Sequence, residues 1–168
     1  MKKLSHLIEL FLLTGFISGC ATSDPPYPGS SERLIGRWKS NKELSSEFNS
    51  KQAQLTEDQI NFLDQMFGRM EIEYREDGTV EIFIPAHELN LMGKQVSMEE
   101  SRSSEPVNII GFDDDTVVFE MEVDYLGKQI SIINFENENT YWVYMSNGIT
   151  TLHAREYFSR IIDGGDNE

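Results

Sequence analysis

Residues 70–84 read MEIEYREDGTVEIFI, and this stretch decides the fold. From Met70 to Tyr74, apolar residues alternate with charged ones, which is the period of a strand with one buried and one solvated face. Asp77-Gly78 is a dipeptide typical of a two-residue hairpin turn, and the alternation resumes after it. The stretch therefore predicts an antiparallel β-hairpin.

The segment before this hairpin has helical spacing instead. Residues 34–39, LIGRWK, predict a first strand. Ser40 and Glu43 have the spacing of a capping box, which predicts that a short helix begins there. Thr56 and Gln59 repeat that spacing, and apolar residues follow them at helical intervals. We therefore expect two short helices between the first and second strands.

After the hairpin, short apolar or alternating segments recur at regular intervals with turn-forming residues between them. The predicted strands are residues 95–101, 107–112, 116–124, 129–136, 140–146 and 149–158. Closely spaced strands with short turns indicate an antiparallel meander, and this many strands favour closure into a barrel. The predicted fold is thus all-β with a helical insert, in which about 8–9 strands form a barrel.

Two short motifs resemble those of the calycins, the group that contains lipocalins and fatty-acid-binding proteins. Gly36-x-Trp38 resembles the start of their first strand, and the helical pair resembles that of the fatty-acid-binding proteins. Arg155-x-Tyr157 resembles the pair on their last strand that holds a ligand carboxylate. The resemblance implies a calycin-like barrel in which Arg155 and Tyr157 contact a ligand, and Trp38 is a candidate for the floor of the ligand cavity. The alternatives are that Trp38 packs in the core and that Arg155 extends to the surface or pairs with a glutamate.

The amino-terminal residues predict export. Residues 1–19 combine Lys2 and Lys3 with a short apolar run, as in a secretory signal peptide. Residues 17–20, ISGC, resemble the lipobox of bacterial lipoproteins, which implies cleavage before Cys20 and acylation of that cysteine. Because Cys20 is the only cysteine of the chain, it cannot form an internal disulfide.

The rest of the chain divides into a tether, a domain and a tail. Residues 20–32 contain the lipidated cysteine and a proline- and serine-rich stretch that predicts a flexible tether. Residues 33–162 form the predicted lipocalin-like barrel domain, and residues 163–168 a disordered tail. Acyl chains on Cys20 would attach the protein to a membrane. Since Ala21 replaces the aspartate of the inner-membrane retention rule, the resemblance implies the outer membrane with the domain in the periplasm.

Charge and motif content exclude several functions. The chain has a net charge of −15, and loss of the signal peptide removes two lysines and one glutamate, which leaves −16. Such a charge repels nucleic acid, so we expect no nucleic-acid partner. We find no nucleophile elbow, phosphate-binding loop or zinc-protease motif. His87-Glu88 has no second ligand at metal-binding spacing. We therefore expect no enzyme, no cofactor and no metal site.

The predicted function is that of an envelope lipoprotein whose barrel binds or carries a small apolar or amphipathic ligand. The alternative is a non-enzymatic interaction or structural module that contacts another envelope protein. That alternative predicts a filled barrel and an exposed apolar patch around Leu89, Leu91 and Met92.

Overall fold

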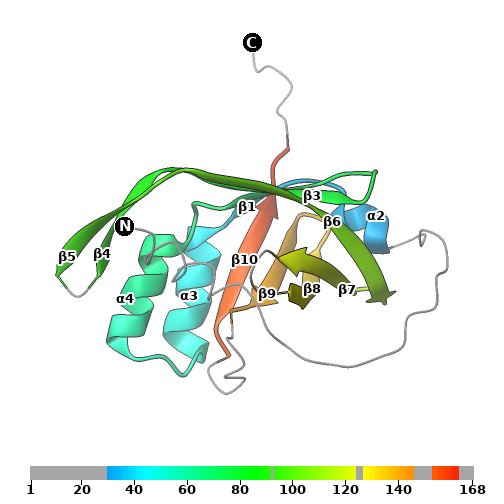
Figure 1. Ribbon diagram of the computed structural model, residues 1–168. Coiled ribbons are helices and arrows are strands. Elements are labelled where there is room, and N and C mark those ends of the chain that lie inside the picture. The colour runs from blue at the N-terminus through cyan, green and yellow to red at the C-terminus, as the bar shows by residue number, and fades with distance from the viewer. Residues whose placement is uncertain (1–29, 92, 124–126, 146–152, 163–168) are drawn as a thin grey trace, which may run out of the picture.

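The structure, a computed structural model, describes residues 30–91, 93–123, 127–145 and 153–162. Eight antiparallel strands form a closed barrel in the order β1-β10-β9-β8-β7-β6-β3-β2 (Figure 1). They are β1 Gly36–Ser40, β2 Glu71–Tyr74, β3 Thr79–Ile84, β6 Ser101–Phe112, β7 Thr116–Val123, β8 Gly127–Asn137, β9 Thr140–Tyr144 and β10 Arg155–Arg160. The predicted antiparallel barrel is confirmed, and its architecture is consistent with a calycin-like fold.

The predicted hairpin is formed by β2 and β3, with Ile72 opposite Ile82. Gly78 has a φ of +81°, a conformation that glycine adopts without steric cost. The Asp77 carboxylate accepts hydrogen bonds from the backbone N–H of Thr79 at 2.9 Å and from its hydroxyl at 2.6 Å. These bonds hold the turn and set the register of the two strands.

Two helices lie between β1 and β2, as predicted. The helices of the described chain are α2 Ser30–Leu34, α3 Lys42–Gln52 and α4 Glu57–Met66. The capping box of Thr56 and Gln59 is present at the start of α4. The capping box predicted from Ser40 is wrong, because Asn41 caps α3 and accepts a hydrogen bond from the Leu44 N–H at 3.0 Å. Ser40 is instead the last residue of β1.

A two-stranded arm extends from the barrel, and the sequence prediction missed half of it. The arm consists of β4 His87–Leu91 and β5 Lys94–Met98, which pair only with each other and pass over the helices (Figure 1). The Gln65 side chain on α4 binds both the N–H and the carbonyl of Asn90, at 2.7 and 3.3 Å. These bonds fix the arm to α4.

The apolar patch predicted on this arm is not exposed. Leu89 is only 2% exposed, and Leu91 is half-buried. Met92, the third residue of that prediction, lies outside the described residues. The prediction is therefore wrong for Leu89, because β4 packs against α4 and covers it.

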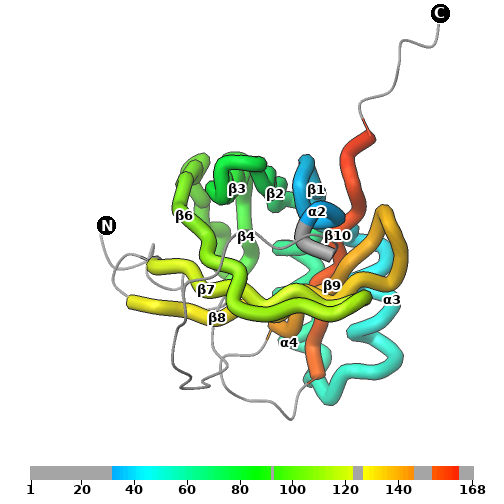
Figure 2. Tube along the Cα trace, turned by 90° about the vertical axis from the view of Figure 1, so that its right-hand side faces the viewer, coloured from blue at the N-terminus to red at the C-terminus, as the bar shows by residue number. Residues whose placement is uncertain are grey.

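Helix α3 replaces a strand at one edge of β10. Strand β1 ends opposite Phe158, so β10 continues beyond its partner. There the N–H groups of Arg155 and Tyr157 donate to the Asn49 amide oxygen at 3.0 Å and to the Ser45 hydroxyl at 2.9 Å. Figure 2 shows β10 running alongside α3. The Phe48 ring of α3 also lies 5.8 Å from that of Tyr157, so the outer face of this part of β10 is covered as well as the face towards the barrel.

Candidate functional site

One layer of the barrel interior is filled by six packed rings, which we call the aromatic base. None of them is more than 6% exposed. Trp38 meets Tyr141 edge-on with ring centres 4.7 Å apart, and Tyr141 stacks on Phe158 at 5.0 Å. The members of the aromatic base are Trp38, Tyr74, Phe119, Phe135, Tyr141 and Phe158. The six rings themselves offer almost no accessible surface to a ligand, whereas Ile109, which faces inward opposite Phe119, is partly buried.

On β1, β9 and β10, a second set of inward-facing side chains lies two residues away from the members of the aromatic base. This set is nearer to the end where β1 leads into α3. Alternation along a strand returns every second side chain to the same face, and paired residues share a face. Ser40 is paired with Phe158, and Glu156 is paired with Val143, so all of them face inward. Ser40, Val143 and Glu156 belong to this set. Three more inward-facing side chains of the barrel wall are only partly buried: Ile82, Glu105 and Ser131. We call these six residues together the helix-end layer.

The helix-end layer is packed less completely than the aromatic base. Ile82, Glu105, Ser131 and Val143 face the interior but are only partly buried. Ser103, which is opposite Ile82, is exposed. Accessible surface on inward-facing side chains means that solvent reaches the interior at this end.

Glu156 is the buried ionisable group of this layer, with 3% of its surface exposed. The Ser40 hydroxyl donates to its Oε1 at 2.5 Å, and the same hydroxyl accepts from the Gly68 N–H at 2.8 Å. Burial raises the pKa of Glu156 to about 7, although the bond from Ser40 acts in the opposite direction. The carboxyl group therefore changes its charge close to neutral pH.

Two tyrosine hydroxyls lie within the same part of the interior. Burial raises the pKa of Tyr74 and of Tyr141, and the nearby Glu156 carboxyl raises that of Tyr141 further. The Tyr141 hydroxyl is buried and meets no partner at hydrogen-bond geometry among the described residues, although Tyr74 lies near it. Both hydroxyls stay neutral, so they can donate or accept a hydrogen bond.

Trp38, the candidate for the floor of a ligand cavity, lies in the aromatic base and is fully buried. Its Nε1–H donates to the Leu34 carbonyl at 2.8 Å, and the Arg160 guanidinium lies 4.2 Å from its ring centre. Arg160 also donates to the Ile35 carbonyl at 2.7 Å. This position corresponds to the alternative that Trp38 packs in the core.

Arg155 and Tyr157 come together as the resemblance implies, but on the outer wall of the barrel. They occupy the face of β10 opposite to Glu156. The Arg155 guanidinium lies 3.6 Å from the Trp142 ring centre and 4.3 Å from that of Phe48, and its Nη1 donates to the Tyr157 hydroxyl at 3.5 Å. A ligand inside the barrel does not reach either side chain.

Sequence reasoning missed Glu156, which stands between the two residues it singled out. Glu156 shares the inward face with Phe158, two residues later, but the sequence alone does not show which face of this strand points inward. Cys20, the remaining predicted site residue, lies outside the described residues. Within the described ranges, no three acidic, histidine or cysteine residues cluster as a metal site would require. No described helix has the length and apolar character needed to cross a membrane.

Comparison with known proteins adds no assignment. No protein-family model, curated protein or solved structure matches the chain. The barrel interior therefore carries the functional information: it contains an aromatic base and, next to it, a partly accessible helix-end layer.

Proposed function

We propose that the barrel binds a small apolar or amphipathic ligand in its helix-end layer. The observation that carries this proposal is the partial exposure of Ile82 and Val143, which are apolar and face inward. An eight-stranded barrel is just wide enough to hold one small ligand. Ligand sites typically combine apolar walls with a few polar groups, and here Ser40 and Glu156 supply the polar groups.

Two physical effects favour binding of a ligand in the helix-end layer: burial of apolar surface and a preformed wall. Covering the accessible apolar surface of Ile82 and Val143 contributes about 25 cal/mol for each Å² removed from water. The aromatic base is already packed, so it neither collapses nor rearranges when a ligand arrives. A preformed wall of this kind reduces the entropy that binding would otherwise cost.

Binding to the interior is tested by native mass spectrometry on residues 21–168, purified from a periplasm without detergent. All eight barrel strands lie between Gly36 and Arg160, so this fragment contains the whole barrel. We expect an additional mass that disappears on denaturation. A clean protein mass, combined with no binding of added fatty amines, alcohols or acids, would contradict the proposal.

A matched pair of substitutions locates the bound mass. Val143→Trp fills the helix-end layer, whereas Ile132→Trp adds the same ring on the outer wall, where Ile132 is 41% exposed. We expect the first variant to lose the additional mass and the second to keep it. Loss in both variants, or in Ile132→Trp alone, would place the ligand outside the barrel.

We also propose that the protein is anchored in the bacterial envelope through acyl chains on Cys20. The lipobox-like residues 17–20 support this proposal, and two or more acyl chains anchor a protein stably. Residues 20–29, which precede α2, would span roughly 35 Å when fully extended, enough for the barrel to stand clear of the lipid surface. Labelled palmitate should be incorporated into the wild type but not into Cys20→Ala, and the variant should leave the membrane fraction.

The second candidate function is that of an interaction module for another envelope protein. It is favoured by exposed apolar side chains on the outer wall: Ile110 is 45%, Ile132 41% and Tyr144 47% exposed. This candidate predicts that Ile132→Glu abolishes binding of a partner without lowering stability, while Val143→Trp leaves the partner bound. The opposite result for this pair would exclude it.

A further inference from the structure

The inward-facing charges at the helix end are all acidic. The helix-end layer contains two carboxyl groups, Glu105 and Glu156, and no basic residue. Arg33 and Arg160 belong to the opposite end of the barrel, where their guanidinium groups lie over rings of the aromatic base. Arg155 lies on the outer wall. A ligand in this layer therefore meets carboxyl and hydroxyl groups, while the basic residues Lys42, at the start of α3, and Arg69, before β2, lie beside the layer but outside it.

The hydrogen-bonding capacity of Glu156 is mostly unused. A carboxylate has two oxygens and about four acceptor sites. Among the described residues, only Ser40 donates to Glu156, at Oε1, and no lysine or arginine pairs with it. Ser40 has a single proton to donate, so Oε2 is left for another donor.

Because Glu156 is buried, having a single hydrogen-bond donor destabilises its charged form. A buried carboxylate loses hydration and is stabilised only by hydrogen bonds or by an opposite charge. The buried Tyr141 hydroxyl has only the nearby Tyr74 hydroxyl beside it among the described residues, and it does not reach that hydroxyl at full hydrogen-bond geometry. The free acceptor sites of Glu156 point to a ligand that brings a hydrogen-bond donor into the interior.

We propose that the helix-end layer selects an amphiphile with a protonated amine head group over one with a carboxylate, and that Glu156 receives the head group. This inference rests on the proposed function, binding of an amphiphile inside the barrel. The ammonium group donates a charge-assisted hydrogen bond to Glu156 while the alkyl chain contacts Ile82 and Val143. A carboxylate head group would instead face Glu105 and Glu156 and be repelled.

The inference is tested with three probes of equal chain length: dodecylamine, dodecanol and dodecanoate. Each is titrated into residues 21–168 below its micelle concentration, at about pH 8, by displacement of an apolar fluorophore. We expect dodecylamine to bind about tenfold or more tightly than dodecanoate, since a hydrogen bond to a charged group is worth that much. Glu156→Gln should lower dodecylamine affinity about tenfold and leave dodecanol affinity unchanged.

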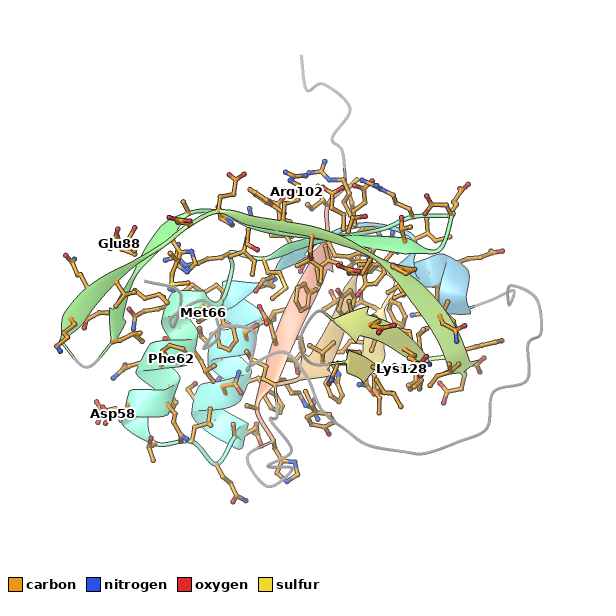
Figure 3. The ribbon with its side chains drawn as sticks, in the orientation of Figure 1. Asp58, Phe62, Met66, Glu88, Arg102 and Lys128 are labelled. Atoms are coloured by element: carbon orange, nitrogen blue, oxygen red, sulfur yellow. The ribbon has the colours of Figure 1, made fainter. Side chains whose placement is uncertain are left out.

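The control separates a local contact from the general acidity of the protein. Glu88→Gln removes the same charge from the exposed face of β4, where Glu88 points away from the helices (Figure 3). We expect this variant to bind dodecylamine as the wild type does. An equal loss in both variants would mean that net charge attracts the amine, and it would overturn the inference.

The remaining outcomes distinguish this inference from the function it rests on. Binding of dodecanoate as tightly as dodecylamine would overturn the amine selectivity but leave the ligand-binding barrel intact. Failure of all three probes to bind would contradict both.

A further measurement on the wild type keeps the test decisive if Glu156→Gln does not fold. Dodecylamine affinity should rise from about pH 5 to about pH 8 as Glu156 ionises. Tyr141 on β9, on which Glu156 acts, and its neighbour Tyr74 on β2 stay neutral over this range. Lys42 at the start of α3 is a further charged group beside Ser40 and Gly68. Glu105 shares the layer, so Glu105→Gln serves as the control for its contribution. An affinity that does not change with pH would overturn the inference.

Discussion

The two layers of the barrel interior are built on opposite principles. In the aromatic base, six rings pack against one another with almost no exposed surface. In the helix-end layer, Ser40 and Glu156 are buried polar groups, while Ile82 and Val143 are apolar but partly accessible. The aromatic base buries nearly all of its apolar surface, whereas the helix-end layer leaves part of its apolar surface accessible. Departures from good packing and full polar satisfaction are concentrated where a protein functions.

The two ends also use their charged residues differently. At the base, Arg33 and Arg160 lie over Phe135 and Trp38 at 4.4 and 4.2 Å and donate to backbone carbonyls. These contacts with rings and carbonyl groups stabilise the base end of the barrel. At the helix end, Glu156 has only Ser40 as a donor among the described residues. The difference supports our proposal that one end stabilises the fold and the other receives a ligand.

The largest expected effect comes from the base. Trp38→Ala removes a fully buried ring and its hydrogen bond, and should lower the free energy of unfolding by about 3–5 kcal/mol. Urea denaturation followed by fluorescence of the remaining tryptophan, Trp142, measures the loss. A loss below about 1 kcal/mol would show that the base is not the stabilising part of the interior.

Glu156→Gln should affect stability in a pH-dependent way. The folded-state pKa of about 7 lies above the ordinary value of 4.5, so the protonated form is favoured by folding. The wild type therefore loses stability as the pH rises through this window, by about 3 kcal/mol at completion. The variant should lack this loss and be the more stable protein at about pH 8. Parallel stability profiles of the two proteins from about pH 4 to about pH 8 would contradict the assignment.

Ser40→Ala should have a smaller effect on stability, about 1–3 kcal/mol, because it removes the donor to Glu156 and the acceptor of the Gly68 N–H. Without the Ser40 hydroxyl, the pKa of Glu156 should move further upward, since this bond lowers it. Carbon-13 NMR of the glutamate carboxyl groups measures the shift. A pKa that moves downward would show that Ser40 does not stabilise the charged form.

The smallest effect on stability is expected at Val143, which faces inward but is half-buried. Val143→Ala should lower the free energy of unfolding by about 1 kcal/mol, near the low end for loss of apolar contacts. Its affinity for dodecanol should fall several-fold, because methyl groups that would contact the alkyl chain are gone. A large loss of stability without a change in affinity would place Val143 with the base rather than with the site.

Local signals predicted much of the fold. The alternation around Asp77-Gly78 predicted β2 and β3, and the capping box of Thr56 and Gln59 predicted the start of α4. The hairpin and the capping box each depend on residues close together in the chain, so a short stretch of sequence is enough to predict them. The same logic failed at Ser40, because its hydroxyl binds Glu156, 116 residues away, and not the start of a helix.

The candidate site was harder to predict because β10 is buried on both faces. Glu156, Tyr157 and Phe158 are consecutive and all at most 5% exposed, so alternation does not reveal the inward side. Helix α3, more than 100 residues earlier, binds the edge of β10 through Ser45 and Asn49 and packs the Phe48 ring against the outward-facing Tyr157. The motif Arg155-x-Tyr157 drew attention to that outer face, whereas the inward side chain is the glutamate between them.

The most direct test of the account is methyl NMR on residues 21–168 labelled at isoleucine, with dodecanol as an uncharged probe. Two residues report on two places: Ile82 on the helix-end layer and Ile132 on the outer wall. We predict that the Ile82 signal shifts on titration and that the Ile132 signal does not move. Shifts at Ile132 with no change at Ile82 would contradict binding inside the barrel.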